Sequence, residues 1–174
     1  FDLATQSFTY YQHDPQNPNS LSDDHVRAIY EFSDEPGILW IATYGGGLNR
    51  FNTKDEIFVH YRHDPNDPHS LPNVQIWCMY EDKAGNFWLG TYGGLAVMDR
   101  IQRQHAGKSA ASPSAQTITF TTYRHHLEDP KSLSAGVVTS ILEDRHCSFW
   151  AGSADGGLNL FDRAKYPIKP PANV

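Results

Sequence analysis

One sequence pattern occurs three times along the chain, and this repetition restricts the chain to a repeat fold. Each copy contains, in the same order, a Tyr-x-His segment, a Ser-Leu pair, a Trp after a large apolar residue, and a Gly-Gly-Leu turn. The three Trp residues are Trp40, Trp88 and Trp150, and the first interval, from Phe1 to Phe51, is 50 residues. Four markers that recur together in a fixed order exclude chance as their source.

Within each copy, short runs of β-branched and aromatic residues lie between Gly, Pro, Asn and Asp, which is typical of strands and turns. The expected strands are 25–32, 39–44, 48–52 and 57–60; then 75–81, 86–91, 95–99 and 118–123; then 137–143, 149–153 and 158–162. A period of 40–50 residues with four short strands is typical of a β-propeller. We therefore predict an all-β fold in which residues 1–174 form a single propeller segment. The segment consists of three blades of the four-stranded type, with repeats 1–50, 51–97 and 98–160. In the third blade we expect only the first three strands.

Three stretches depart from the pattern. An insertion of about 15 residues, at roughly 100–116, is polar and rich in small residues, so we predict a flexible surface loop and not a helix. The tail 161–174 contains several prolines, which cannot donate to a sheet, so a good fourth strand is not expected there. Ser7–Tyr11, by contrast, reads as a spare strand that could complete the last blade of another chain.

Three blades cannot plausibly close a ring, because each would have to cover about 120°, whereas natural rings use about 4–8 blades. Three arrangements stay open: a piece of a longer propeller, two copies that share one six-bladed ring, and an open partial array. An uncovered sheet edge favours association. We therefore expect further blades in the same chain, or a second copy, as a partner.

Charge and composition exclude several classes of function. The chain has 14 Lys+Arg against 20 Asp+Glu, a net charge of −6, and no basic cluster, which argues against a nucleic-acid partner. No run approaches 18 apolar residues, so we expect no contact with a membrane. The start, Phe1-Asp2-Leu3, shows no signal-peptide pattern. Two cysteines are too few for a disulfide scaffold or a four-Cys zinc site.

The block Y-x-H-D-P-x-x-P-x-S-L-S, followed by G-x-L-W-I-A-T-Y-G-G-G-L-N-R-F, resembles the two-component regulator propeller repeat. The resemblance covers nearly the whole chain except the insertion and the last dozen residues. It implies the ligand-sensing region of a membrane-anchored receptor, located in the periplasm and reading an oligosaccharide. It also implies that a histidine kinase or diguanylate cyclase elsewhere in the parent protein produces the output.

A four-stranded meander places the connections between units and the loops between second and third strands on one face. The His-Asp-Pro, Ser-Leu and Thr-Tyr-Gly-Gly segments should therefore converge there, with the insertion on the opposite face. Loops on a rigid scaffold commonly carry binding sites, so this is the candidate ligand face.

Residues that recur in every unit are expected to serve the scaffold. We assign the repeated Trp to packing between blades, the Gly pairs to turns with positive φ, and the His-Asp-Pro segments to loop structure. A metal site needs three or more converging ligands, and one His per blade does not provide them. The repeated carboxylates, such as Glu81-Asp82, lie at strand ends. We therefore expect no catalytic residue, no cofactor and no metal in this segment.

Residues that differ between the units on the candidate face are free to serve a ligand. These are Arg27, Tyr44, Trp77, Tyr92 and Asp155. Charged hydrogen bonds combined with aromatic faces suit an oligosaccharide or another polar small ligand. There are two alternatives. In the first, these residues form a rim that binds no ligand, and the segment is a non-catalytic structural or protein-interaction propeller. In the second, the segment is a propeller glycosidase or lyase. The last needs an unrepeated carboxylate pair, and Asp155 has no matched partner.

Overall fold

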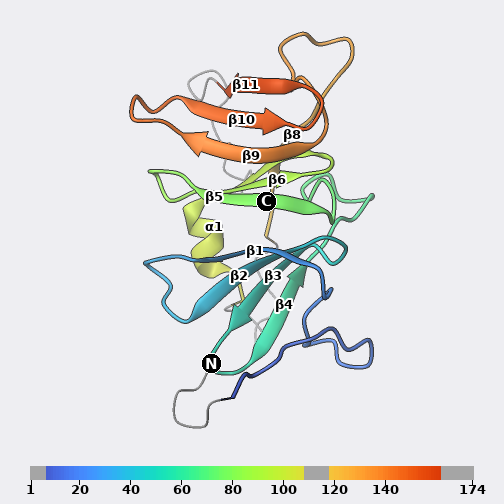
Figure 1. Ribbon diagram of the computed structural model, residues 1–174, viewed down its shortest axis with the longest axis vertical. Coiled ribbons are helices and arrows are strands. Elements are labelled where there is room, and N and C mark those ends of the chain that lie inside the picture. Colours follow the sequence, from blue (N-terminus) through green and yellow to red (C-terminus); the bar gives the residue numbers. More distant parts are fainter. Residues whose placement is uncertain (1–6, 108–117, 162–174) are drawn as a thin grey trace.

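The computed structural model describes residues 7–107 and 118–161, which form three antiparallel sheets and one short helix (Figure 1). The first sheet contains β1 (Val26–Glu31), β2 (Ile38–Thr43), β3 (Leu48–Asn52) and β4 (Ile57–Tyr61). The second contains β5 (Ile76–Glu81), β6 (Phe87–Thr91), β7 (Gly94–Met98) and β8 (Thr121–Tyr123). The third contains β9 (Val138–Glu143), β10 (Phe149–Ser153) and β11 (Gly157–Phe161), and the helix is α1 (Arg100–His105).

Each sheet is a meander in which consecutive strands pair, in the orders β1-β2-β3-β4, β5-β6-β7-β8 and β11-β10-β9. The sheets lie one after another along the long axis of the molecule (Figure 1). The predicted all-β propeller architecture is confirmed, with strand ends within a few residues of those expected. The strand expected at 118–123 begins only at Thr121. The backbone and hydroxyl of Thr119 donate instead to the Gln102 side chain of the insertion.

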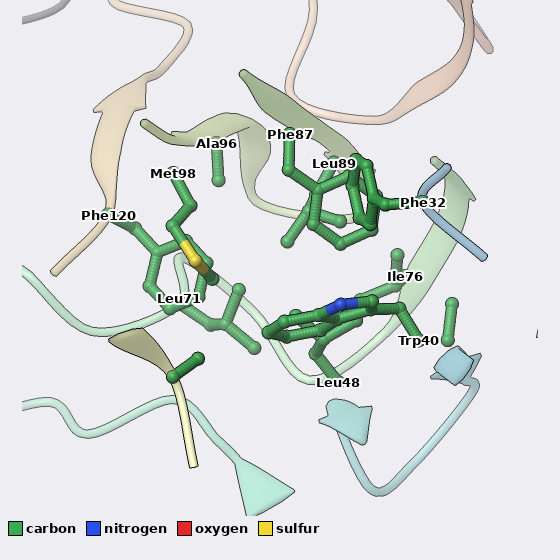
Figure 2. Close-up of a cluster of buried hydrophobic side chains, with 12 residues drawn as sticks. Phe32, Trp40, Leu48, Leu71, Ile76, Phe87, Leu89, Ala96, Met98 and Phe120 are labelled. Carbon is green, nitrogen blue, oxygen red and sulfur yellow. The ribbon is translucent and has the colours of Figure 1, made fainter. Parts of the chain in front are cut away.

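The sheets are held together by aromatic side chains from facing blades. Trp40 is fully buried, and its ring lies edge-on to Phe87 of the next blade at 5.4 Å between centroids. Figure 2 shows both residues in a cluster that also contains Phe32, Leu48 and Met98. Trp88 repeats this packing against Phe149 at 4.3 Å. Because full burial of such a side chain contributes roughly 1.5–3 kcal/mol, these contacts dominate the interface between blades.

The fourth strand of each complete blade covers its Trp with a Tyr. Trp40 stacks on Tyr61 at 5.8 Å and 24°, and Trp88 stacks on Tyr123 at 6.2 Å and 20°. Burial raises the pKa of Tyr61 to about 12, because the phenolate would lose its hydration. The predicted packing role between blades is therefore confirmed for Trp40 and Trp88, whereas Trp150 is half-buried and faces an open region.

The repeated carboxylates organise the turns at the ends of the innermost strands. Asp82 accepts a hydrogen bond from the Trp88 indole N–H at 2.7 Å, and Asp144 accepts one from Trp150 at 3.0 Å. The bond from Trp150 is the main cause that lowers the pKa of Asp144 to about 2. Phe32 takes the equivalent place in the first blade, so the buried Trp40 indole N–H has no partner among the described residues.

The prediction that the insertion forms a loop without a helix is wrong for its first part, because residues 100–105 form α1. The side chain of Asp99 accepts from the Gln102 backbone N–H and caps the helix start. Arg103, fully buried, then reaches the turn between β1 and β2. There it pairs with Asp34 at 3.0 Å and with Glu35 at 2.8 Å, and its guanidinium lies 3.6 Å from the centre of the Phe32 ring. This tertiary contact has no signature in the polar composition of the insertion. As expected, the helix lies at the end opposite the candidate ligand face (Figure 1).

The prediction of a strand at Ser7–Tyr11 is also wrong, since only Ser7 makes an isolated bridge. Tyr11 instead packs on Phe51 and Phe58 and donates to Glu56. The segment lies beside the first sheet, whereas the open edge of the third sheet, β11, lies at the other end of the molecule (Figure 1). Side-chain contacts hold the segment against the first sheet, and residues 8–11 form no ladder with a described strand, although the outer edge of β4 is nearby. The prediction for the tail concerns residues 162–174, outside those described.

Replacing Arg103 by Met should lower the free energy of unfolding by about 3 kcal/mol, because it leaves the carboxylates of Asp34 and Glu35 without their buried counter-ion. Arg100→Met is the matched control, since the Arg100 side chain contacts the same Asp34 but is 53 % exposed. It should cost less than about 1 kcal/mol. Urea unfolding measures both, and equal losses would contradict the central role of Arg103.

The same ion pairs predict a dependence on pH. Hydrogen bonds from Arg103 lower the pKa of Asp34 to about 2 from an ordinary value of 3.8. A depressed folded-state pKa stabilises the fold above the unfolded value, and this contribution is lost as the pH falls through about 4 to about 2. Unfolding free energies measured between pH 5 and pH 2 should fall less steeply in Asp34→Asn than in the native chain, by about 2 kcal/mol over the range. Parallel curves would contradict the pairing.

Candidate functional site

The segments predicted to share one face do meet in the structure. The Asn49 side chain accepts a hydrogen bond from the Ser22 backbone, and Asn159 does the same for Ser134. The Ser-Leu segments and the turns between second and third strands therefore lie at one end of the blades. We call this end the upper face.

The repeated His and Ser residues on this face are structural, as predicted. His13 and His63 each use Nδ1 to bond the carbonyl of the Leu eight positions later, at 2.8 and 2.7 Å. The Ser20 hydroxyl accepts from the Asp14 backbone and closes its loop. Among residues 7–107 and 118–161, no group of three or more His, Cys, Asp or Glu could hold a metal ion.

Arg27 and Trp77 occupy β-bulges. The register of β1 against β2 shifts between Val26 and Ala28, and that of β5 against β6 shifts between Ile76 and Cys78. A bulge leaves its extra residue outside the regular ladder and redirects that side chain. Each of these two blades thus has one redirected side chain on its innermost strand. The residue type at this position differs between the blades, with Arg27 in the first and Trp77 in the second.

The bulges bring three of the five predicted ligand residues together. The Arg27 guanidinium carbon lies 4.7 Å from the centre of the Trp77 ring and 5.0 Å from that of Tyr44. The two rings meet edge-on at 6.2 Å. Arg27 and Tyr44 belong to the first blade and Trp77 to the second, so this cluster joins two blades. We call these three residues the inter-blade cluster.

Arg27 offers the accessible donors of the inter-blade cluster, and no described residue uses them. Arg27 is exposed, and in the described part of the chain it has no ion pair or hydrogen bond. The Trp77 indole nitrogen is buried, with no acceptor among the described residues. A cation–π contact of this kind contributes about 0.5–1 kcal/mol at an exposed position and restrains the guanidinium. The cluster is therefore a preorganised surface with unused donors.

The other two predicted ligand residues lie on the same face but in different turns. Tyr92, which is 54 % exposed, follows β6, and Asp155 lies exposed between β10 and β11. Neither forms a ring contact or ion pair with the inter-blade cluster. His25, which was not among the predicted ligand residues, does lie beside the cluster, edge-on to Tyr44 at 6.5 Å. The sequence contained a signal for His25, because the aligned residues in the other two units are Gln75 and Val137.

Two concave regions on the third blade do not include the cluster. One is lined by Leu133 and the outer strand β11, at the place that β4 occupies in the first blade. The other is lined by Ile141, Leu142, Trp150 and Leu158, on the face where each earlier blade meets the next. Both therefore correspond to positions that a strand or a blade fills elsewhere in the chain.

The comparisons with known proteins agree with this geometry. The family model described as two component regulator propeller matches residues 20–45 and 70–93, which contain the Ser-Leu turn, β1 or β5, and the Trp strand. The chain carries two-component regulator propeller repeats. No curated protein matches it. In the described part of the chain, no helix has the length and apolar character that crossing a membrane requires.

Solved propeller domains are similar to the whole segment. The extracellular domain of BT3049 from B. thetaiotaomicron, assigned as a hybrid two component system, is 25 % identical with a TM-score of 0.65, and the match covers 93 % of this chain. That of BT4673 from the same organism is 26 % identical with a TM-score of 0.63, and the match covers 87 %. Each match covers only 19 % of the solved chain, so this segment spans about one fifth of those domains.

Because Arg27 is exposed, Arg27→Gln should lower the free energy of unfolding by no more than about 1 kcal/mol, the contribution of its two ring contacts. Urea unfolding checks this value and shows that the variant is fit for binding experiments. A loss above about 2 kcal/mol would show that Arg27 serves the fold.

Proposed function

We propose that this chain is a ligand-sensing segment of the periplasmic sensor domain of a membrane-anchored hybrid two-component receptor, and that its ligand is an oligosaccharide or a similar polar small molecule. Three facts support the proposal. The chain carries the repeat of these receptors, it is similar to extracellular domains assigned to them, and it spans about one fifth of those domains. The remaining blades and the output domain would then belong to the parent protein.

The observation that carries the ligand proposal is the inter-blade cluster. Its two rings offer apolar surfaces, and Arg27 offers donors that nothing in the described chain uses. A sugar presents C–H faces to such rings and oxygens to such donors. Tyr92 and Asp155 extend the proposed surface toward the second and third blades.

The position of the cluster suggests how binding could produce a signal. Because Arg27 and Trp77 come from different blades, a ligand that contacts both stabilises one relative placement of the two sheets. Such a ligand shifts a receptor between two arrangements only as far as its affinities for them differ. In this proposal the segment binds and transmits, and it does not catalyse.

A structural or protein-interaction propeller is the second candidate. It is favoured by the apolar side chains exposed on the third sheet, Leu142, Leu158 and Leu160, which are 56, 69 and 60 % exposed. We attribute this face to the next blade, in the same chain or in a second copy, because the equivalent faces of the first two sheets are covered by a blade. This candidate predicts no binding of any oligosaccharide.

Calorimetric titration of the complete protein that contains this chain, with a panel of oligosaccharides, should detect binding. Trp77→Ala should weaken it about tenfold, because one aromatic face is lost. Tyr92→Ala and Asp155→Asn test whether the site extends beyond the inter-blade cluster. Arg145→Gln is the control, since Arg145 is exposed in the turn between β9 and β10 on the opposite face. A folded protein that binds no oligosaccharide would contradict the proposal and favour the second candidate.

A further inference from the structure

We infer that the ligand of the inter-blade cluster carries an acidic group, a carboxylate or a sulfate, which binds the Arg27 guanidinium. The inference rests on the proposed function and narrows its ligand class. The first observation is that Arg27 is stacked but not neutralised. Its guanidinium is held within 4.7 and 5.0 Å of two ring centres, yet it forms no ion pair or hydrogen bond among the described residues.

The acidic residues that precede β1 already have other partners. Asp23 accepts a hydrogen bond from the His25 backbone at 2.8 Å, and Asp24 accepts one from the His13 backbone at 2.6 Å. Asn73, the residue equivalent to Asp23 in the second blade, makes the same bond to Gln75. The Asp23 carboxylate also lies 3.4 Å from Nδ1 of His25, and among the described residues it forms no ion pair with Arg27.

The chemistry of a stacked guanidinium favours an oxyanion. The guanidinium carbon lies within 5.0 Å of both ring centres, and a guanidinium has pairs of N–H donors that match the two oxygens of a carboxylate or sulfate. The Trp77 indole N–H is buried, so Arg27 supplies the accessible donors of the cluster. Neutral sugar hydroxyls can use these donors, but they do not compensate the charge.

The charge of the chain as a whole makes Arg27 decisive for an acidic ligand. At a net charge of −6 the chain repels anions at long range. Salt screens this repulsion beyond about 8 Å, so a single well-placed cation determines whether an anion binds at the site. Removal of Arg27 should therefore affect acidic and neutral sugars differently.

The test uses matched pairs of ligands on the complete protein. Calorimetry compares tetragalacturonate with its neutral methyl ester, and a sulfated tetrasaccharide with its desulfated form. We expect the acidic member of at least one pair to bind about tenfold more tightly or better. The pair that shows the preference identifies the acid as carboxylate or sulfate. Arg27→Gln should weaken binding of the acidic member about tenfold more than binding of the neutral member, and so remove the preference. Arg27→Lys, which keeps the charge but loses the fork of donors, should retain part of it, and Arg145→Gln should change nothing.

The outcomes separate this inference from the proposed function. If acidic and neutral members bind equally, or if the preference survives in Arg27→Gln, the inference is wrong and the proposed sugar site stands. If the folded protein binds no member of either pair and no oligosaccharide of the wider panel, the proposed function fails and the inference fails with it.

Discussion

A four-stranded sheet has two faces, and in a propeller each of them must be covered by another sheet. In this chain the covering group is the Trp of one blade, which lies against an aromatic residue of the next blade and under a Tyr of its own fourth strand. On the outer face of the third blade, which no described strand covers, Trp150 borders an open concave region, and neighbouring leucines are exposed. The rest of the segment depends on this requirement, because burial of these rings fixes how one blade is placed against the next.

The repeat made the strands and their order predictable, because strand signals that recur three times confirm one another. Neither of the two errors lies in a repeated element. The helix α1 depends on Arg103, whose partners Asp34 and Glu35 are about 70 positions earlier in the sequence. The segment Ser7–Tyr11, expected as a strand, is held instead by side-chain contacts of Tyr11 with Phe51, Phe58 and Glu56. Periodicity reports local preference and cannot reveal either of these distant partners.

The first blade shows how such departures occur together. Its turn after β1 has Phe32 where the other blades have an Asp that binds the Trp, and it is two residues longer than theirs. The same turn supplies Asp34 and Glu35, and Phe32 lies under the Arg103 guanidinium. The blade that lacks the usual turn bond is thus the blade that the inserted helix covers, so the two irregular features form one interaction.

The candidate site was predictable to the extent that its residues break the repeat. Arg27, Trp77 and Tyr44 were identified because their aligned positions differ between units, and the structure brings the three together. Alignment could not show that Arg27 and Trp77 occupy β-bulges, nor that Arg27 lies against Tyr44 and Trp77 while Tyr92 and Asp155 stay apart from them. A bulge frees its side chain from the packing that fixes the other inner-strand positions. Residues at these bulges can therefore change without cost to the buried Trp contacts, which lets one scaffold carry a different set of exposed side chains between each pair of blades.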